Sequence, residues 1–144
     1  MKLLISRCLL GEACRYDGAS KPLPAETLSA LRASFELVPV CPEVLGGLPT
    51  PRTPSERQGS RVVMKTGEDV SAQYRLGAET ALAIARRERV CAALLKERSP
   101  SCGKGRIYDG TFTGTLTEGN GVTAEVLLKN GFAVYGESEL EKIL

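Results

Sequence analysis

The sequence contains no histidine and no tryptophan. Without an imidazole side chain, Ser-His-Asp and Cys-His catalysis, histidine-ligated haem and every zinc site that uses histidine are excluded. Aromatic residues make up only 5% of the chain, which disfavours a nucleic-acid surface built on base stacking. The 19 basic and 17 acidic residues give a formal net charge of +2, too balanced for phosphate binding. We therefore expect no direct nucleic-acid binding.

Long apolar runs are also missing. No stretch approaches the roughly 20 apolar residues that span a membrane. The apolar start, residues 1–6, is too short for a signal peptide and leads directly into Arg7 and Cys8. We therefore expect a cytoplasmic protein without membrane association, whose thiols stay reduced. Five cysteines cannot all pair within one chain, and clustered cysteines in a reducing compartment usually bind metal or carry out chemistry.

The length and composition predict one globular domain over residues 1–144, because 42% of the residues are hydrophobic and 25% are charged. Short apolar runs alternate with segments of helical periodicity, which is typical of the α/β class. We expect a mostly parallel sheet with helices on both faces. The predicted strands are 2–6, 35–40, 90–95 and 132–135, and the predicted helices are 24–34, 71–89, 120–130 and 137–144.

Two long segments interrupt this alternation. Residues 41–60 contain four prolines and are expected to be irregular, and residues 96–105 form a second loop rich in Gly, Pro and Ser, followed by turns up to position 118. Between them, residues 61–70 predict a hairpin that turns at Thr66 and Gly67. Loops of this length in a small domain usually carry function.

Three cysteines fall where the predicted parallel strands end. Cys8 follows the first strand, Cys41 ends the second, and Cys102 lies in the loop after the third. Since sites in open parallel sheets form at the carboxyl ends of the strands, we expect these cysteine-bearing loops to meet. Cys14 shares the loop of Cys8. Cys91 lies inside a predicted apolar strand, where we expect it to be a small buried core residue.

The spacing of these cysteines bears on the metal that they could hold. Structural zinc sites and dithiol redox centres use close pairs such as C-x₂-C. The nearest pair here, Cys8 and Cys14, has five residues between its members. Isolated cysteines on separate loops suit the larger body of an iron–sulfur cluster. The spacing favours a cluster and leaves open both a four-thiolate zinc site and the absence of metal.

The segments around the cysteines carry a family resemblance. They read CLLGEACRYDG from Cys8, PVCPEVLGGLPTPR from Pro39 and KERSPSCG from Lys96. Together with GRIYDGTFTG over 105–114 and GNGVTAEVLLKNG over 119–131, they resemble a small bacterial family, the 2-thiouracil desulfurases. The resemblance covers essentially the whole chain, and no motif position departs from it.

The resemblance implies an oxygen-sensitive enzyme that removes sulfur from a thiolated nucleobase, converting 2-thiouracil to uracil and sulfide. It also implies a 4Fe–4S cluster held by only three ligands, Cys8, Cys41 and Cys102. Glu43 and Ser99 match the positions that carry catalysis in the family.

Three ligands also make physical sense, because they leave one iron open, as a catalytic zinc keeps an open position for water or substrate. Soft thiocarbonyl sulfur matches such an iron, which would polarise the C=S bond as a Lewis acid does. Water could then replace sulfur without net electron transfer. In this interpretation Glu43 transfers the protons, and Ser99 hydrogen-bonds the base or relays a proton.

Simpler interpretations stand beside these. Glu43 could be a solvated loop carboxylate, and Ser99 an ordinary turn residue before Pro100. The alternative for the whole protein is a non-enzymatic metal-binding or redox-sensing module in which Cys14 is a fourth ligand. Three cations near the motifs could either orient a substrate or be ordinary surface charges: Arg15, Arg52 and Lys96.

Overall fold

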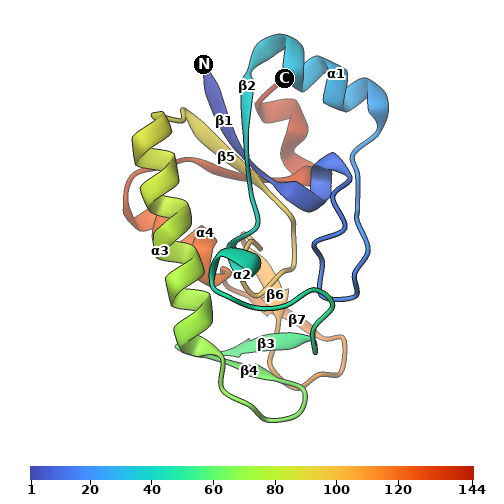
Figure 1. The fold of residues 1–144 in the computed structure, drawn as a ribbon, viewed down its shortest axis with the longest axis vertical. Coiled ribbons are helices and arrows are strands. Elements are labelled where there is room, and N and C mark those ends of the chain that lie inside the picture. The colour runs from blue at the N-terminus through green and yellow to red at the C-terminus, as the bar shows by residue number, and fades with distance from the viewer.

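Four strands form one parallel sheet, in the order β2-β1-β5-β8, at the centre of the computed structural model, which describes residues 1–144. The register sets Ser6 beside Val40 and Leu95 beside Gly136, so the strands end at one edge (Figure 1). This confirms the predicted α/β domain with a parallel sheet. The strands are β1 (Lys2–Ser6), β2 (Glu36–Val40), β5 (Ala92–Leu95) and β8 (Val134–Gly136).

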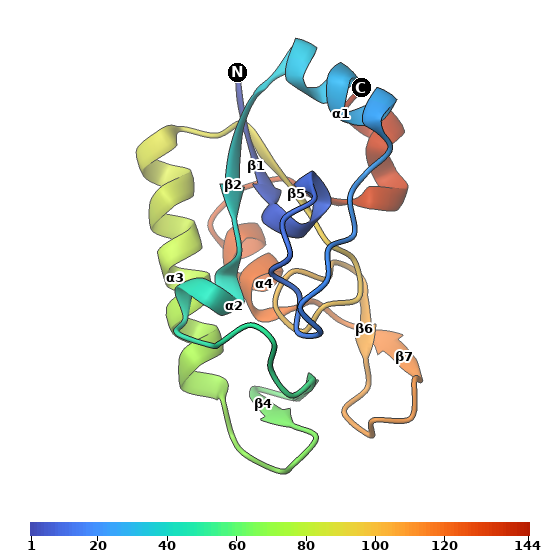
Figure 2. The same cartoon turned by 45° about the vertical axis from the view of Figure 1, so that its right-hand side comes forward.

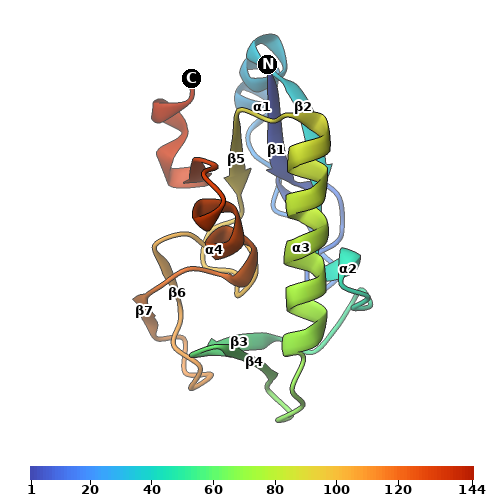
Figure 3. The same cartoon turned by 90° about the vertical axis from the view of Figure 1, so that its left-hand side faces the viewer.

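Helices cover both faces of the sheet, as expected (Figure 3). Successive strand residues point to opposite faces, so Leu3 and Ile5 pack with α1 and η2, whereas Leu4 packs with α3 and α4. Burial on both faces explains the continuous apolar runs of the central strands β1 and β5, whereas the edge strand β2 is partly exposed. None of the helices is both long and apolar enough to cross a bilayer. The covering helices are α1 (Ala25–Ser34), α3 (Ser71–Glu88), α4 (Val122–Lys129) and the 3₁₀ helix η2 (Glu137–Lys142).

Beyond the carboxyl edge of the sheet, the loops build a second half of the molecule (Figures 1 and 2). It contains two antiparallel hairpins, β3-β4 and β6-β7, and two short helical turns. The long segments that the sequence left irregular therefore contain regular structure. These elements are η1 (Arg7–Leu10), α2 (Pro42–Leu45), β3 (Ser55–Gln58), β4 (Arg61–Met64), β6 (Arg106–Tyr108) and β7 (Leu116–Glu118).

The hairpin predicted over 61–70 forms only in part: the chain turns at Thr66 and Gly67 as expected, but the main strand pairing lies elsewhere. β4 pairs with β3, which precedes it, through a turn in which Gly59 has φ +63°. Across the predicted turn the pairing is short: one isolated bridge joins Val63 to Asp69, and the backbone N–H groups of Met64 and Val70 donate to the carbonyl oxygens of Glu68 and Val62. The sequence of β3 is SERQ, and a strand of four polar residues shows no apolar alternation by which it could be recognised.

Two smaller predictions are also wrong. Cys91 is exposed rather than buried, because β5 begins one residue later, at Ala92. The helix predicted from position 120 begins at Val122, after Gly121 at the capping position, and the Asn120 side-chain oxygen instead accepts a hydrogen bond from the backbone N–H of Gly105. In both cases the pattern located the element correctly and placed its start two residues too early.

The short helix α2 packs on α3 through two glycines (Figure 3). A Cβ atom on Gly46 would lie 2.0 Å from the carbonyl oxygen of Gln73, and one on Gly77 would lie 1.9 Å from that of Pro42. Both distances are far below van der Waals contact, so the two backbones approach with no side chain between them. This contact determines where α2 sits along α3.

We predict that Gly77→Ala destabilises the protein by about 1–3 kcal/mol, since the added methyl group has no space and must push α2 away. Helix propensity alone would predict the opposite, a stabilisation of about 1 kcal/mol. Denaturant unfolding measures the difference. The control is Glu79→Ala, an exposed position of α3. A stabilised Gly77→Ala variant would show that the close contact is absent.

Candidate functional site

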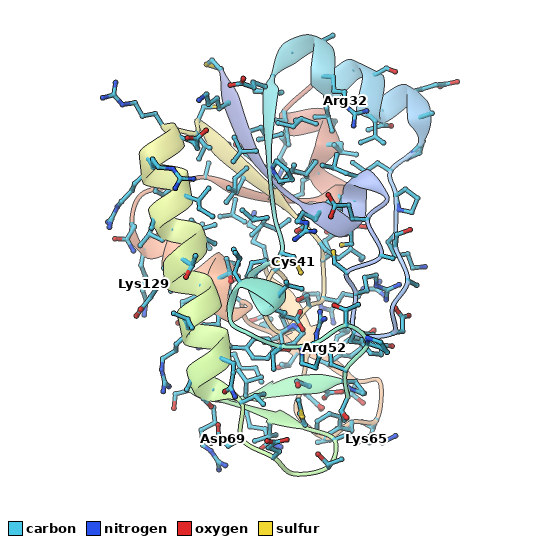
Figure 4. All side chains as sticks on the ribbon, viewed as in Figure 1. Arg32, Cys41, Arg52, Lys65, Asp69 and Lys129 are labelled. Atoms are coloured by element: carbon cyan, nitrogen blue, oxygen red, sulfur yellow. The ribbon has the colours of Figure 1, made fainter.

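A cavity of about 570 Å³ opens at the carboxyl edge of the sheet. Its walls come from the segments after β1, β2 and β5, from the β3-β4 hairpin and from the loop between β6 and β7. Four of the five cysteines, Cys8, Cys14, Cys41 and Cys102, line it, and all four are buried. Figure 4 shows Cys41 where β2 ends, in the middle of the molecule. The parallel sheet thus brings together the cysteine-bearing loops, as the sequence predicted.

Each of the three cysteines after a strand reaches the cavity through a tight local structure. Cys8 lies in η1, which follows β1 without a gap. Cys41 lies between β2 and α2, directly before Pro42 at the first helical position. The loop of Cys102 is closed by Ser99, whose Oγ accepts hydrogen bonds from the backbone N–H groups of Ser101 and Cys102, both at 3.0 Å.

Cys14 lies beside two of these thiols. The pKa of Cys14 is raised: a hydrogen bond with Cys41 lowers it, but one with Cys8, together with burial, outweighs that effect. The Cys14 carbonyl oxygen also accepts a hydrogen bond from the Cys41 thiol at 3.8 Å. Distance alone therefore gives no reason to treat Cys14 differently from the other three cysteines as a candidate metal ligand.

Three of the buried thiols, those of Cys14, Cys41 and Cys102, have raised pKa values and hold their protons at neutral pH. A hydrogen bond with Cys14, and then burial, raise the pKa of Cys41, and burial raises the pKa of Cys102 to about 12. A metal that binds thiolates must therefore displace these protons. No three His, Cys, Asp or Glu side chains converge closely enough to hold a single metal ion. Soft thiols spread around a cavity are a donor set that fits a multi-iron cluster.

Glu43 lies in the first turn of α2 and lines the same cavity. Its side chain is only 16% exposed, so it is not a solvated loop carboxylate. Its Oε1 accepts hydrogen bonds from Nε of Arg52 at 3.0 Å and from the hydroxyl of Tyr74 at 2.8 Å. The carboxylate is therefore held in one orientation by two side chains from other segments.

Arg52 binds the protein and is not free to orient a substrate. Its side chain is 2% exposed. Besides Glu43, it donates to the carbonyl oxygens of Cys14 and Pro49, each at 3.0 Å, and to Oγ1 of Thr50 at 3.1 Å. Figure 4 shows Arg52 in the middle of the molecule, below Cys41. This residue therefore joins the first cysteine loop to α2 and to the loop that follows it.

The other two cations named from the sequence also have acidic partners. Lys96 pairs with Glu137 at 3.1 Å, and Arg15 lies 3.7 Å from Asp17. Both cations also line the cavity.

Sequence reasoning missed two residues that shape the site. Tyr74 lies among the apolar residues on the buried side of α3, yet its hydroxyl reaches Glu43. Glu56 is 9% exposed and accepts hydrogen bonds from the backbone N–H groups of Gly110 and Phe112, which hold the β6-β7 loop over the cavity. A tyrosine in an apolar stripe is a usable signal, because a buried hydroxyl needs a partner.

Comparison with known proteins gives consistent similarities over nearly the whole chain. Residues 3–139 match the family model described as 2-thiouracil desulfurase. The uncharacterized protein YbbK of Bacillus subtilis (strain 168) is 42% identical over 152 aligned residues, which cover 99% of this chain and 99% of that protein. A solved structure named 4Fe–4S-dependent thiouracil desulfidase TudS is 48% identical, with a TM-score of 0.94 over 98% of this chain and 93% of that chain.

We predict that Arg52→Lys lowers the free energy of unfolding by about 3 kcal/mol, because lysine cannot make the several directed bonds of the buried guanidinium and leaves Glu43 poorly paired. Denaturant unfolding measures the loss. The matched control is Arg61→Lys, whose partner Asp69 is exposed, and which should change stability by less than about 1 kcal/mol. Equal effects of the two substitutions would contradict the role assigned to Arg52.

Proposed function

The chain belongs to the 2-thiouracil desulfurase family, and on that premise we propose that it converts a thiolated nucleobase such as 2-thiouracil to its oxo form and sulfide. The family makes it a desulfurase, and its structural neighbour is named as acting on thiouracil with a 4Fe–4S cluster. The observation that carries the proposal is the convergence of buried thiols and a carboxylate on one cavity. An oxygen-sensitive cluster is consistent with the cytoplasm as its location.

Cys8, Cys41 and Cys102 are the proposed cluster ligands, because they come from three different strand ends and line one cavity. When bound, the cluster would offer an open iron that polarises the thiocarbonyl bond as a Lewis acid. Burial of all three thiols would keep water from the ligand sulfurs.

Glu43 is the proposed proton-transfer residue. Three carboxylates line the cavity, and each accepts hydrogen bonds: Glu43 from Arg52 and Tyr74, Glu56 from backbone N–H groups, and Glu97 from the N–H and hydroxyl of Ser138. Glu43 is the one that the family resemblance places at a catalytic position. Glu43 is also only two positions from Cys41 along the chain. It would take a proton from the attacking water and return it to the departing group.

Ser99 is proposed to act as a hydrogen-bond donor. A hydroxyl group has one donor hydrogen and two acceptor positions. The Oγ of Ser99 already accepts two backbone hydrogen bonds, from Ser101 and Cys102. Its O–H therefore remains to donate to the substrate or to pass a proton on, while its oxygen keeps the Cys102 loop closed.

A second candidate function is a metal-binding or redox-sensing module with four ligands. The observation in its favour is the position of Cys14, buried against both Cys8 and Cys41. A cluster with four protein ligands would have no open iron and would suit electron transfer rather than desulfuration.

The ligand set is tested by anaerobic purification, followed by measurement of iron and acid-labile sulfide per chain. We expect a brown protein, loss of iron in the separate Cys8→Ser, Cys41→Ser and Cys102→Ser variants, and full retention in Cys91→Ser, which alters the exposed cysteine. Cys14→Ser should also retain its iron. Loss of iron in Cys14→Ser would favour the four-ligand module, and a colourless zinc protein would refute the cluster.

The role of Glu43 is tested by Glu43→Gln, which keeps a hydrogen-bond acceptor of the same size and removes the base. We expect unchanged iron and at least about a 100-fold lower rate of uracil and sulfide formation from 2-thiouracil. Glu79→Gln, on the exposed side of α3, is the control and should keep the full rate. Undiminished turnover of Glu43→Gln would remove this carboxylate from the mechanism.

A further inference from the structure

The two oxygens of the Glu43 carboxylate have different surroundings. Oε1 accepts both of its hydrogen bonds from protein, one from Arg52 and one from Tyr74. Oε2 accepts none. Since no buried side-chain nitrogen or oxygen atom of the protein lacks a partner, Oε2 is not enclosed and is reached from the cavity that Glu43 lines. One oxygen is thus held, and the other is available for chemistry.

Tyr74 can hold Oε1 because its own position is determined by packing. The residue is only 2% exposed and belongs to an apolar core with Leu48, Val62 and Ala78. Burial, followed by the nearby Glu43 charge, raises the pKa of the Tyr74 phenol, so the hydroxyl remains a donor at all physiological pH values. A rigid phenol with a permanent proton is suited to orienting a carboxylate.

The close backbone contact between α2 and α3 brings the Tyr74 hydroxyl within hydrogen-bonding distance of Glu43. Tyr74 lies on α3 one turn before Gly77, and Glu43 lies on α2 directly after Pro42. Because the carbonyl oxygen of Pro42 meets Gly77 without an intervening side chain, the two helices are close enough for a 2.8 Å bond between the Tyr74 hydroxyl and Glu43. Gly46 and Gly77 therefore determine both the packing of the two helices and the hydrogen bond in the site.

We propose that Tyr74 is a positioning residue for the desulfuration reaction: together with Arg52 it immobilises Oε1 of Glu43 and so presents Oε2 to the water and the departing sulfur. This inference rests on the proposed function. It assigns Tyr74 no contact with the reacting atoms, and it makes the phenol hydroxyl, rather than the ring, the part that matters for turnover.

The kinetic test compares cluster-loaded parent and Tyr74→Phe with 2-thiouracil as substrate. Phenylalanine keeps the packing of the ring and removes only the hydroxyl. We expect kcat to fall roughly 10- to 100-fold, with KM and iron content unchanged, because a carboxylate held by Arg52 alone is less precisely placed for proton transfer. The matched control is Tyr135→Phe, a half-buried tyrosine outside the cavity, which should keep the parent kcat. Unchanged kcat in Tyr74→Phe, or a rise in KM alone, would overturn the inference.

A second measurement does not depend on turnover. Thermal unfolding of the cluster-loaded parent, Tyr74→Phe, Glu43→Ala and the double variant forms a mutant cycle. We expect Tyr74→Phe to lower the melting temperature in the parent. In the Glu43→Ala background it should leave the melting temperature unchanged or raise it, because there it removes a buried hydroxyl that has lost its acceptor. An equal decrease in both backgrounds would show that the two groups do not interact.

The two measurements separate the possible failures. A parent protein that releases no sulfide from 2-thiouracil refutes the proposed function and, with it, the role of Tyr74 in that reaction. An active parent whose kcat is insensitive to Tyr74→Phe refutes only the positioning role. An active parent with a selective loss of kcat and the expected reversal in melting temperature supports both.

Discussion

The common carboxyl edge of the parallel sheet is the constraint on which the rest of the structure depends. Because β1 pairs in parallel with both β2 and β5, the residues that follow these strands must emerge side by side. Cys8 and Cys41 follow their strands within two positions and Cys102 follows β5 by seven, so the sheet itself brings these distant residues together. Apolar burial of the strands on both faces keeps this edge rigid.

Beyond that edge, a few polar contacts and close approaches order loops that have little core. Arg52 joins the Cys14 loop to Glu43, Glu56 holds the β6-β7 loop, and Ser99 closes the loop of Cys102. Arg52 and Glu56 are buried, so each bond they lose leaves an unsatisfied partner at a cost of about 1–3 kcal/mol. The side chains that line the cavity therefore also hold its loops in place. A substitution that changes the site will also change the stability of these loops.

The sequence predicted the elements whose stability is local and missed those that depend on neighbours. Continuous apolar runs predicted the buried strands, and the helical periodicity of residues 71–89 predicted α3. The polar strand β3 showed no such pattern, because its pairing with β4 and the role of Glu56 arise only in the folded chain. The exposure of Cys91 was missed for a related reason, since the start of β5 is set by pairing with its neighbours and not by its own residues.

The sequence by itself determined the class of fold, the three strand ends that carry cysteines, and the family. Each of these depends on apolar periodicity or on the order of motifs, which are properties of the linear chain. Only the tertiary structure decided that Glu43 is held rather than solvated, that Arg52 serves the protein and not a substrate, and that Tyr74 belongs to the site. These facts depend on the approach of α2 to α3 at two glycines. That approach is a relation between two surfaces, and no local pattern in either segment specifies the distance between them.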